Sequence, residues 1–179
     1  MKGYKILLWI GLLIFIIGMI AEINAIDYLY HGLVVGPVFY TVGILWWIPK
    51  RLKKPILHPY DPDEYKSTSD AGLAFLMNNF LLEFWAGCCY LVMVMFLAGG
   101  LLMKQTEGYQ VSEDILETDE TVRSEFGKLR GMGHLISGSS SSQNAELLIT
   151  IFGSEKNGSV KIDIVKQPDR WELEELKFY

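Results

Sequence analysis

Cysteine is almost absent from this chain: there are two, Cys88 and Cys89, and they are neighbours. No Cys-x-x-Cys pair occurs, so neither a haem-attachment site nor a redox dithiol is indicated. On a helix, adjacent side chains point about 100° apart, which favours small packing residues over a disulfide or a metal site. Walker loops, zinc signatures and nucleophile elbows are also missing. We therefore expect no enzyme and no cofactor, and we name no catalytic, cofactor-binding or metal-binding residue.

The last part of the chain has fewer basic than acidic side chains. Residues 104–179 contain 9 basic and 14 acidic side chains, whereas residues 1–103 contain 7 of each, so the net charge of −5 belongs to the C-terminal part. An acidic region repels nucleic acid and anionic lipid head groups. Nucleic acid is therefore not an expected partner.

What the chain does have is long uncharged apolar runs, at residues 6–21, 28–49 and 84–103. A helix needs roughly 20 predominantly apolar residues to cross a hydrocarbon core of about 30 Å. We predict three transmembrane helices, at about 6–26, 28–49 and 80–103, with the lipid bilayer as a partner. The first run also fits a signal peptide cleaved near Ala25, but its core is at the long end for that purpose.

Basic residues set the expected direction of these helices. They precede the first run and follow the second, where residues 50–54 read KRLKK, whereas the link between the two runs has none. By the positive-inside rule, the N-terminus and the loop 50–70 are cytoplasmic and residues 104–179 lie outside. The predicted location is therefore multi-pass in a plasma membrane, with an extracytoplasmic C-terminal domain.

A helix over residues 71–103 would be about 50 Å long, too long for one crossing. We expect either that residues 71–83 lie along the inner interface, which would place Glu83 near the head groups, or that the helix is long and tilted. In the second apolar run, Gly32, Gly36 and Gly43 predict a face where helices pack closely.

Titratable residues at the ends of the apolar runs are the candidates for chemistry. Glu22 and Glu83 are costly in lipid, and an interfacial side chain is favoured over a proton-path role for each. His31, His58 and His134 fall in three separate regions on two sides of the predicted membrane. We therefore do not expect the three histidines to form one site.

The C-terminal region predicts a small α+β domain. Residues 112–127 read as one helix, with Ser112 as its cap and Gly127 as its stop. Alternating apolar residues then predict a meander of three or four antiparallel strands packed against the helix; they are expected at about 134–142, 145–153, 159–166 and 170–179. The last strand keeps one apolar face only if a bulge occurs at Glu174–Glu175.

This C-terminal pattern resembles the cytochrome c oxidase assembly factor family. The resemblance covers residues 112–179 and rests on FGKLRGMGHLISGS, on AELLITIFGSEKNGSVKIDIVKQPDRWELEELKF, and on four positions that match the family's motifs: Gly127, Gly153, Gly158 and Trp171. The same domain occurs in a subunit of the mitochondrial presequence translocase. Family members have a Pro-Ile pair where this chain has Lys128 to Met132, and usually one transmembrane helix instead of three.

The resemblance implies a domain on the outer face of an energy-transducing membrane. The N-terminus has no Arg-rich presequence, which favours a bacterial plasma membrane over a mitochondrion. The resemblance also implies a non-enzymatic assembly or scaffold factor that docks on a membrane protein complex, with terminal oxidase subunits as candidate partners. Two alternatives stay open: a membrane-bound sensor or ligand-binding module, and an intramembrane enzyme that uses Glu83 with His58.

Overall fold

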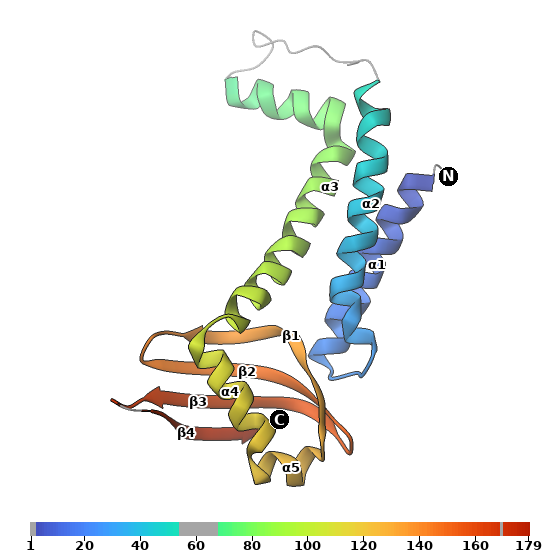
Figure 1. The fold of residues 1–179 in the computed structure, drawn as a ribbon. Coiled ribbons are helices and arrows are strands. Elements are labelled where there is room, and N and C mark those ends of the chain that lie inside the picture. The colour runs from blue at the N-terminus through green and yellow to red at the C-terminus, as the bar shows by residue number, and fades with distance from the viewer. Residues whose placement is uncertain (1–2, 54–67, 169) are drawn as a thin grey trace.

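The computed structural model describes residues 3–53, 68–168 and 170–179. It has a helical part followed by a four-stranded antiparallel sheet with helices, so the predicted α+β class is confirmed (Figure 1). The helices are α1 (Gly3–Ile23), the short η1 (Leu29–His31), α2 (Gly32–Leu52), α3 (Thr68–Lys104), α4 (Glu107–Thr118) and α5 (Glu120–Phe126). The strands are β1 (Leu129–Ser140), β2 (Asn144–Gly153), β3 (Asn157–Lys166) and β4 (Trp171–Phe178). In the described ranges, three helical spans are long and apolar enough to cross a membrane.

The helices α1 and α2 pack against each other through glycine. A Cβ atom added at Gly18 would lie 2.3 Å from the backbone nitrogen of Leu33, and one added at Gly36 would lie 2.6 Å from that of Phe15. Only glycine permits such backbone approach. The close-packing face predicted from the glycines of the second apolar run is confirmed, and Gly18 of α1 completes it.

The third helix has two segments. Phe80 has a non-helical φ of −132° inside α3, and the segment before it turns away from the rest of the helix (Figure 1). One long tilted helix is therefore wrong, and the position of residues 71–83 along the inner interface stays a prediction. After the bend, α3 contacts α2 through the Tyr40 hydroxyl, which donates to the Ala86 carbonyl at 3.1 Å.

One predicted helix, 112–127, is in fact two. Helix α4 begins at Glu107 because the Thr106 hydroxyl accepts from the Tyr109 N–H at 3.2 Å. Asp119 is extended and ends α4, and its carboxylate then caps α5. Ser112, the predicted cap, is buried within α4 and donates to the Gly108 carbonyl at 2.8 Å. An Asp is a strong N-cap, which explains why a second helix starts in mid-sequence.

The sheet is a meander of order β1-β2-β3-β4, and α4 lies across one face (Figure 1). Between them lies a core of fully buried side chains: Tyr109, Leu116, Val122, Phe126, Ala145, Leu147, Ile149, Ile151, Val160, Ile162 and Ile164. The first strand begins at Leu129, not at His134 as predicted, because the glycine-rich segment pairs with β2 through a register shift between Met132 and Ile136.

The bulge in the last strand is confirmed. Asp163 pairs with Glu175 and the next residue, Ile164, pairs with Leu173, so Glu174 is the extra residue. The shift keeps Leu173 and Leu176 opposite core residues of β3.

Candidate functional site where the helices meet the sheet

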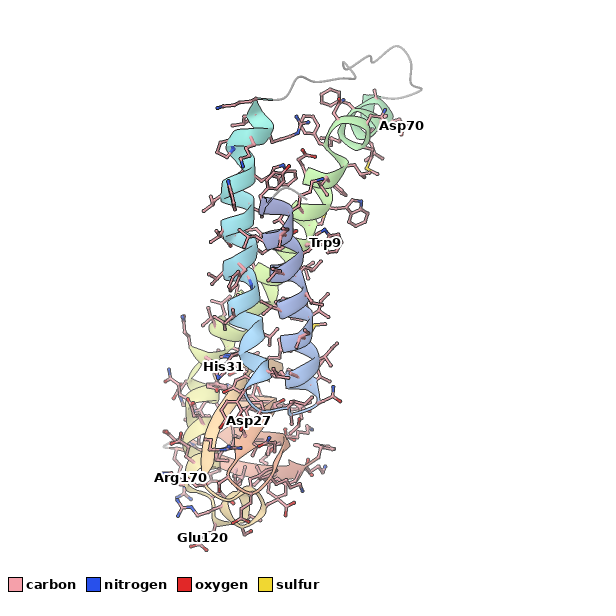
Figure 2. The ribbon with its side chains drawn as sticks, turned by 90° about the vertical axis from the view of Figure 1, so that its right-hand side faces the viewer. Trp9, Asp27, His31, Asp70, Glu120 and Arg170 are labelled. Atoms are coloured by element: carbon pink, nitrogen blue, oxygen red, sulfur yellow. The ribbon has the colours of Figure 1, made fainter. Side chains whose placement is uncertain are left out.

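The end of α1 and the turn that leads to α2, residues 22–31, contact the sheet and form with it what we call the junction. Figure 2 shows Asp27 and His31 at the end of the helices next to the sheet. Ala25 and Tyr28 have φ values of 51° and 65°, the left-handed region that turns the chain sharply. The Asp27 carboxylate accepts from the Tyr28 N–H at 2.9 Å and stabilises this turn.

Glu22 is the most buried polar residue of the junction. Its side chain is 0% exposed, and one carboxylate oxygen accepts from the Leu135 N–H of β1. Leu135 lies where the β1–β2 pairing shifts register, so its N–H points out of the ladder and is available. The Glu22 main-chain oxygen also accepts from the Thr150 hydroxyl, at 3.4 Å. The end of α1 is thereby bonded to both β1 and β2.

Gly133 makes room for the Glu22 carboxylate. A Cβ atom at position 133 would lie 2.3 Å from Glu22 Oε1. Any larger residue there would displace the carboxylate from the β1 backbone. The bulged, glycine-containing segment of β1 is therefore complementary in shape to the end of α1.

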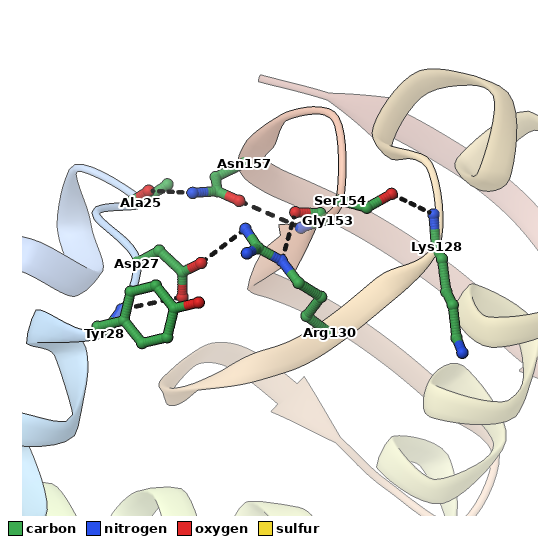
Figure 3. A network of polar contacts seen from close by, with 8 residues as sticks. All are labelled: Ala25, Asp27, Tyr28, Lys128, Arg130, Gly153, Ser154 and Asn157. Atoms are coloured by element: carbon green, nitrogen blue, oxygen red, sulfur yellow. Dashed lines mark hydrogen bonds and ion pairs between the residues drawn. The ribbon is translucent and has the colours of Figure 1, made fainter.

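A second polar network lies beside the first, around Arg130 (Figure 3). The Arg130 guanidinium pairs with the Asp27 carboxylate at 2.6 Å and donates through Nε to the Gly153 carbonyl at 2.8 Å. The Asn157 amide donates to the Ala25 carbonyl at 3.1 Å. Three elements of the sheet domain, β1, the end of β2 and the start of β3, thus hold the turn between α1 and α2.

Aromatic rings close the junction. The Tyr30 ring stacks on Phe152 of β2, with centroids 4.1 Å apart, and lies 5.4 Å from the His134 ring. The ring centroids of His31 and His134 are 6.0 Å apart. The expectation that the histidines stay in separate regions is wrong for this pair, because the turn after α1 folds onto β1. His58 lies outside the described residues.

Burial is the largest influence on His134. It lowers the pKa of the imidazole below its usual value of 6.5, and the nearby cation Lys104 and His31 act in the same direction. The neutral form is therefore favoured in the folded state. Its Nε2 and the second carboxylate oxygen of Glu22 have no hydrogen-bond partner among the described residues.

The junction is arranged for attachment. Glu22, Arg130 and Asn157 each bond across it, to a backbone atom or to an opposite charge. Within residues 3–53, 68–168 and 170–179, no group of three or more His, Cys, Asp or Glu side chains is placed to hold a metal ion. Cys88 and Cys89 are half-buried free thiols in α3.

Glu83 lies at the other end of the helices, where its carboxylate pairs with the Arg51 guanidinium. Arg51 also donates to the Asn79 carbonyl at 2.8 Å, and its guanidinium lies 4.7 Å from the Phe80 ring centroid. The ion pair therefore ties the end of α2 to the bend in α3. It provides a structural role for the residue singled out as a possible catalytic group.

The sequence indicated Glu22 by its cost in lipid but missed its partners. Asp27, Arg130 and Asn157 have no local signal, since each contacts residues remote in the sequence. The one usable clue was the pair of glycines Gly131 and Gly133, because glycine inside a strand often marks a bulge or close backbone approach.

No family model, curated protein or solved structure matches the chain. The fold and the junction define a class: a helical part with three apolar, membrane-span-like helices, to which an α+β domain is fixed at several points. The resemblance to the oxidase assembly factor family stays a prediction.

Proposed function

We propose that the chain is a non-enzymatic, membrane-anchored assembly or scaffold factor that holds its α+β domain at a fixed orientation for docking on a membrane protein complex. The observation that supports this most is the junction. Glu22, Asp27, Tyr30 and Ala25 each contact the sheet domain directly. A domain that only needed tethering would require none of these contacts, whereas a scaffold requires a defined orientation.

The proposal includes the direction of the domain. The basic residues at the end of the helices remote from the sheet, Lys50 and Arg51 among them, support a cytoplasmic position for that end. The α+β domain then lies on the extracytoplasmic side of a plasma membrane. Labelling of single cysteines, introduced at exposed Tyr179 or at exposed Leu52 in a chain without Cys88 and Cys89, with an impermeant reagent on intact cells tests this direction. Labelling at position 52 and not at 179 would contradict it.

The resemblance in the C-terminal region makes terminal oxidase subunits the first partners to test. The experiment is affinity purification of the C-terminally tagged chain from native membranes in mild detergent, followed by mass spectrometry. We expect oxidase subunits or haem-insertion factors with the wild-type chain. A clean oligomer without partners would overturn the assembly role.

A charge swap in the junction links this test to the structure. Arg130→Asp places two carboxylates against each other and should release the orientation of the domain, reducing partner recovery several-fold. The double variant Arg130→Asp with Asp27→Arg restores an opposite pair and should restore recovery. If Arg130→Asp folds and retains the partner fully, fixed orientation is not what the partner requires.

A further inference from the structure

The helical part has an open apolar groove at the end remote from the sheet. It lies between α1 and α3, and Tyr40 of α2 also lines it. The groove has a volume of about 170 Å³ and is lined by Lys5, Leu8, Trp9, Leu12, Tyr40, Leu82, Trp85, Ala86 and Cys89. Trp9 (Figure 2) and Trp85 are both more than half exposed.

In a bilayer such a groove must be filled, because apolar walls without partner atoms lose their dispersion contacts. A single acyl chain is narrow and apolar enough to lie in such a groove.

The charge at the groove indicates which lipid. A second groove on the other flank of α3 contains Arg51, whose charge is balanced by Glu83. In the first groove, by contrast, Lys5 has no ion-pair partner among the described residues. An unbalanced ammonium beside an apolar groove complements the phosphate of an anionic lipid.

We propose that this groove binds one acyl chain of an anionic phospholipid, with the lipid phosphate at Lys5. The site depends on the helices crossing a bilayer and is independent of the scaffold role. The lipid would bridge α1 and α3 at this end of the helices.

The test uses the full chain in phosphatidylcholine vesicles that contain a small fraction of brominated lipid, which quenches tryptophan on contact. Brominated phosphatidylglycerol should quench Trp9 and Trp85 at about fivefold lower fraction than brominated phosphatidylcholine. Lys5→Gln should remove this preference. Lys53→Gln removes a basic charge from the same end of the helices but outside the groove. This variant should keep the preference for phosphatidylglycerol.

A chain with Trp9→Phe and Trp85→Phe gives the background from the other tryptophans. Equal quenching by the two lipids in the wild type, or loss of the preference in both lysine variants, would overturn the site. Protection of Trp9 and Trp85 from both lipids, together with crosslinking between copies, would also overturn it and assign the groove to a helix of a second chain.

Discussion

Helices α1 and α2 form two interfaces that are built on different principles. Along their length, the two helices meet backbone to backbone at glycines such as Gly18 and Gly36. At their tip, they meet the sheet through a buried carboxylate, an ion pair and a ring stack. The first interface depends on the absence of side chains and the second on the identity of a few.

The α1–α2 interface folds the helical part, whereas the contacts at the tip orient the sheet domain. Close packing of small residues holds helices together where the surroundings offer no hydrophobic driving force. Polar contacts at the tip are directional, so they fix how the sheet domain sits on the helices. Substitutions along the length should therefore unfold the helical part, whereas substitutions at the tip should release the domain and leave both parts folded.

The largest effect is expected at Gly36. Gly36→Leu would drive a side chain into the backbone of α1 and should cost about 3 kcal/mol of stability, the upper end of the typical range for overpacking. Thermal unfolding in detergent and the yield of monodisperse protein measure this. Gly99→Leu is the matched control, because nothing lies within 4 Å of a Cβ added there. Equal losses in the two variants would contradict glycine packing as the basis of the α1–α2 interface.

Glu22→Ala should have the next largest effect. It leaves the partly buried Leu135 N–H without its acceptor, a loss of about 1.5–3 kcal/mol for a hydrogen bond to a charged group. Hydrogen exchange at the Leu135 amide should accelerate by about tenfold or more, while core amides of β3 stay protected. Glu22→Gln retains an acceptor oxygen and should recover part of the protection. Unchanged exchange at Leu135 in Glu22→Ala would show that the carboxylate does not hold the β1 bulge.

The ion pair between Arg130 and Asp27 should contribute less, because the Arg130 side chain is 44% exposed. A double-mutant cycle with alanine at both positions should give a coupling free energy of about 0.5–1 kcal/mol. The pair Arg170–Glu172, at 76% and 42% exposure, is the control and should give a coupling free energy near zero. Similar values for the two pairs would mean that Arg130 contributes no more than an exposed surface contact.

The sequence allowed the meander of the sheet to be predicted, apart from the start of β1, but not the junction. Alternation of apolar residues at 170–179 predicted a bulge at Glu174–Glu175, because a one-residue slip reverses the faces of a strand, and the extra residue is Glu174. Glu22 and Leu135, by contrast, are 113 residues apart, and no periodicity links them. The start of α4 was missed for a smaller reason: Thr106 and Ser112 are both capable caps, and burial of Tyr109 favours the earlier one.

The smallest effect should come from the protonation of His134 as the pH falls. Because the pKa of His134 is lowered in the folded chain, the unfolded state takes up its proton first as pH falls below 6.5. The stability that the neutral ring contributes is therefore present above this value and is lost as pH falls through the lower folded-state pKa. The charged imidazole would then face Lys104, His31 and the Tyr30 ring.

We expect the unfolding free energy to be lower at about pH 5.5 than at about pH 7.5. Thermal unfolding at the two pH values measures it, and His134→Phe, which keeps a ring beside Tyr30, should reduce the difference. The other titratable groups of the junction, Glu22, Asp27 and His31, remain in that variant as an internal reference. If His134→Phe leaves the pH dependence unchanged, the response belongs to those groups, and His134 serves the junction only as a packed ring.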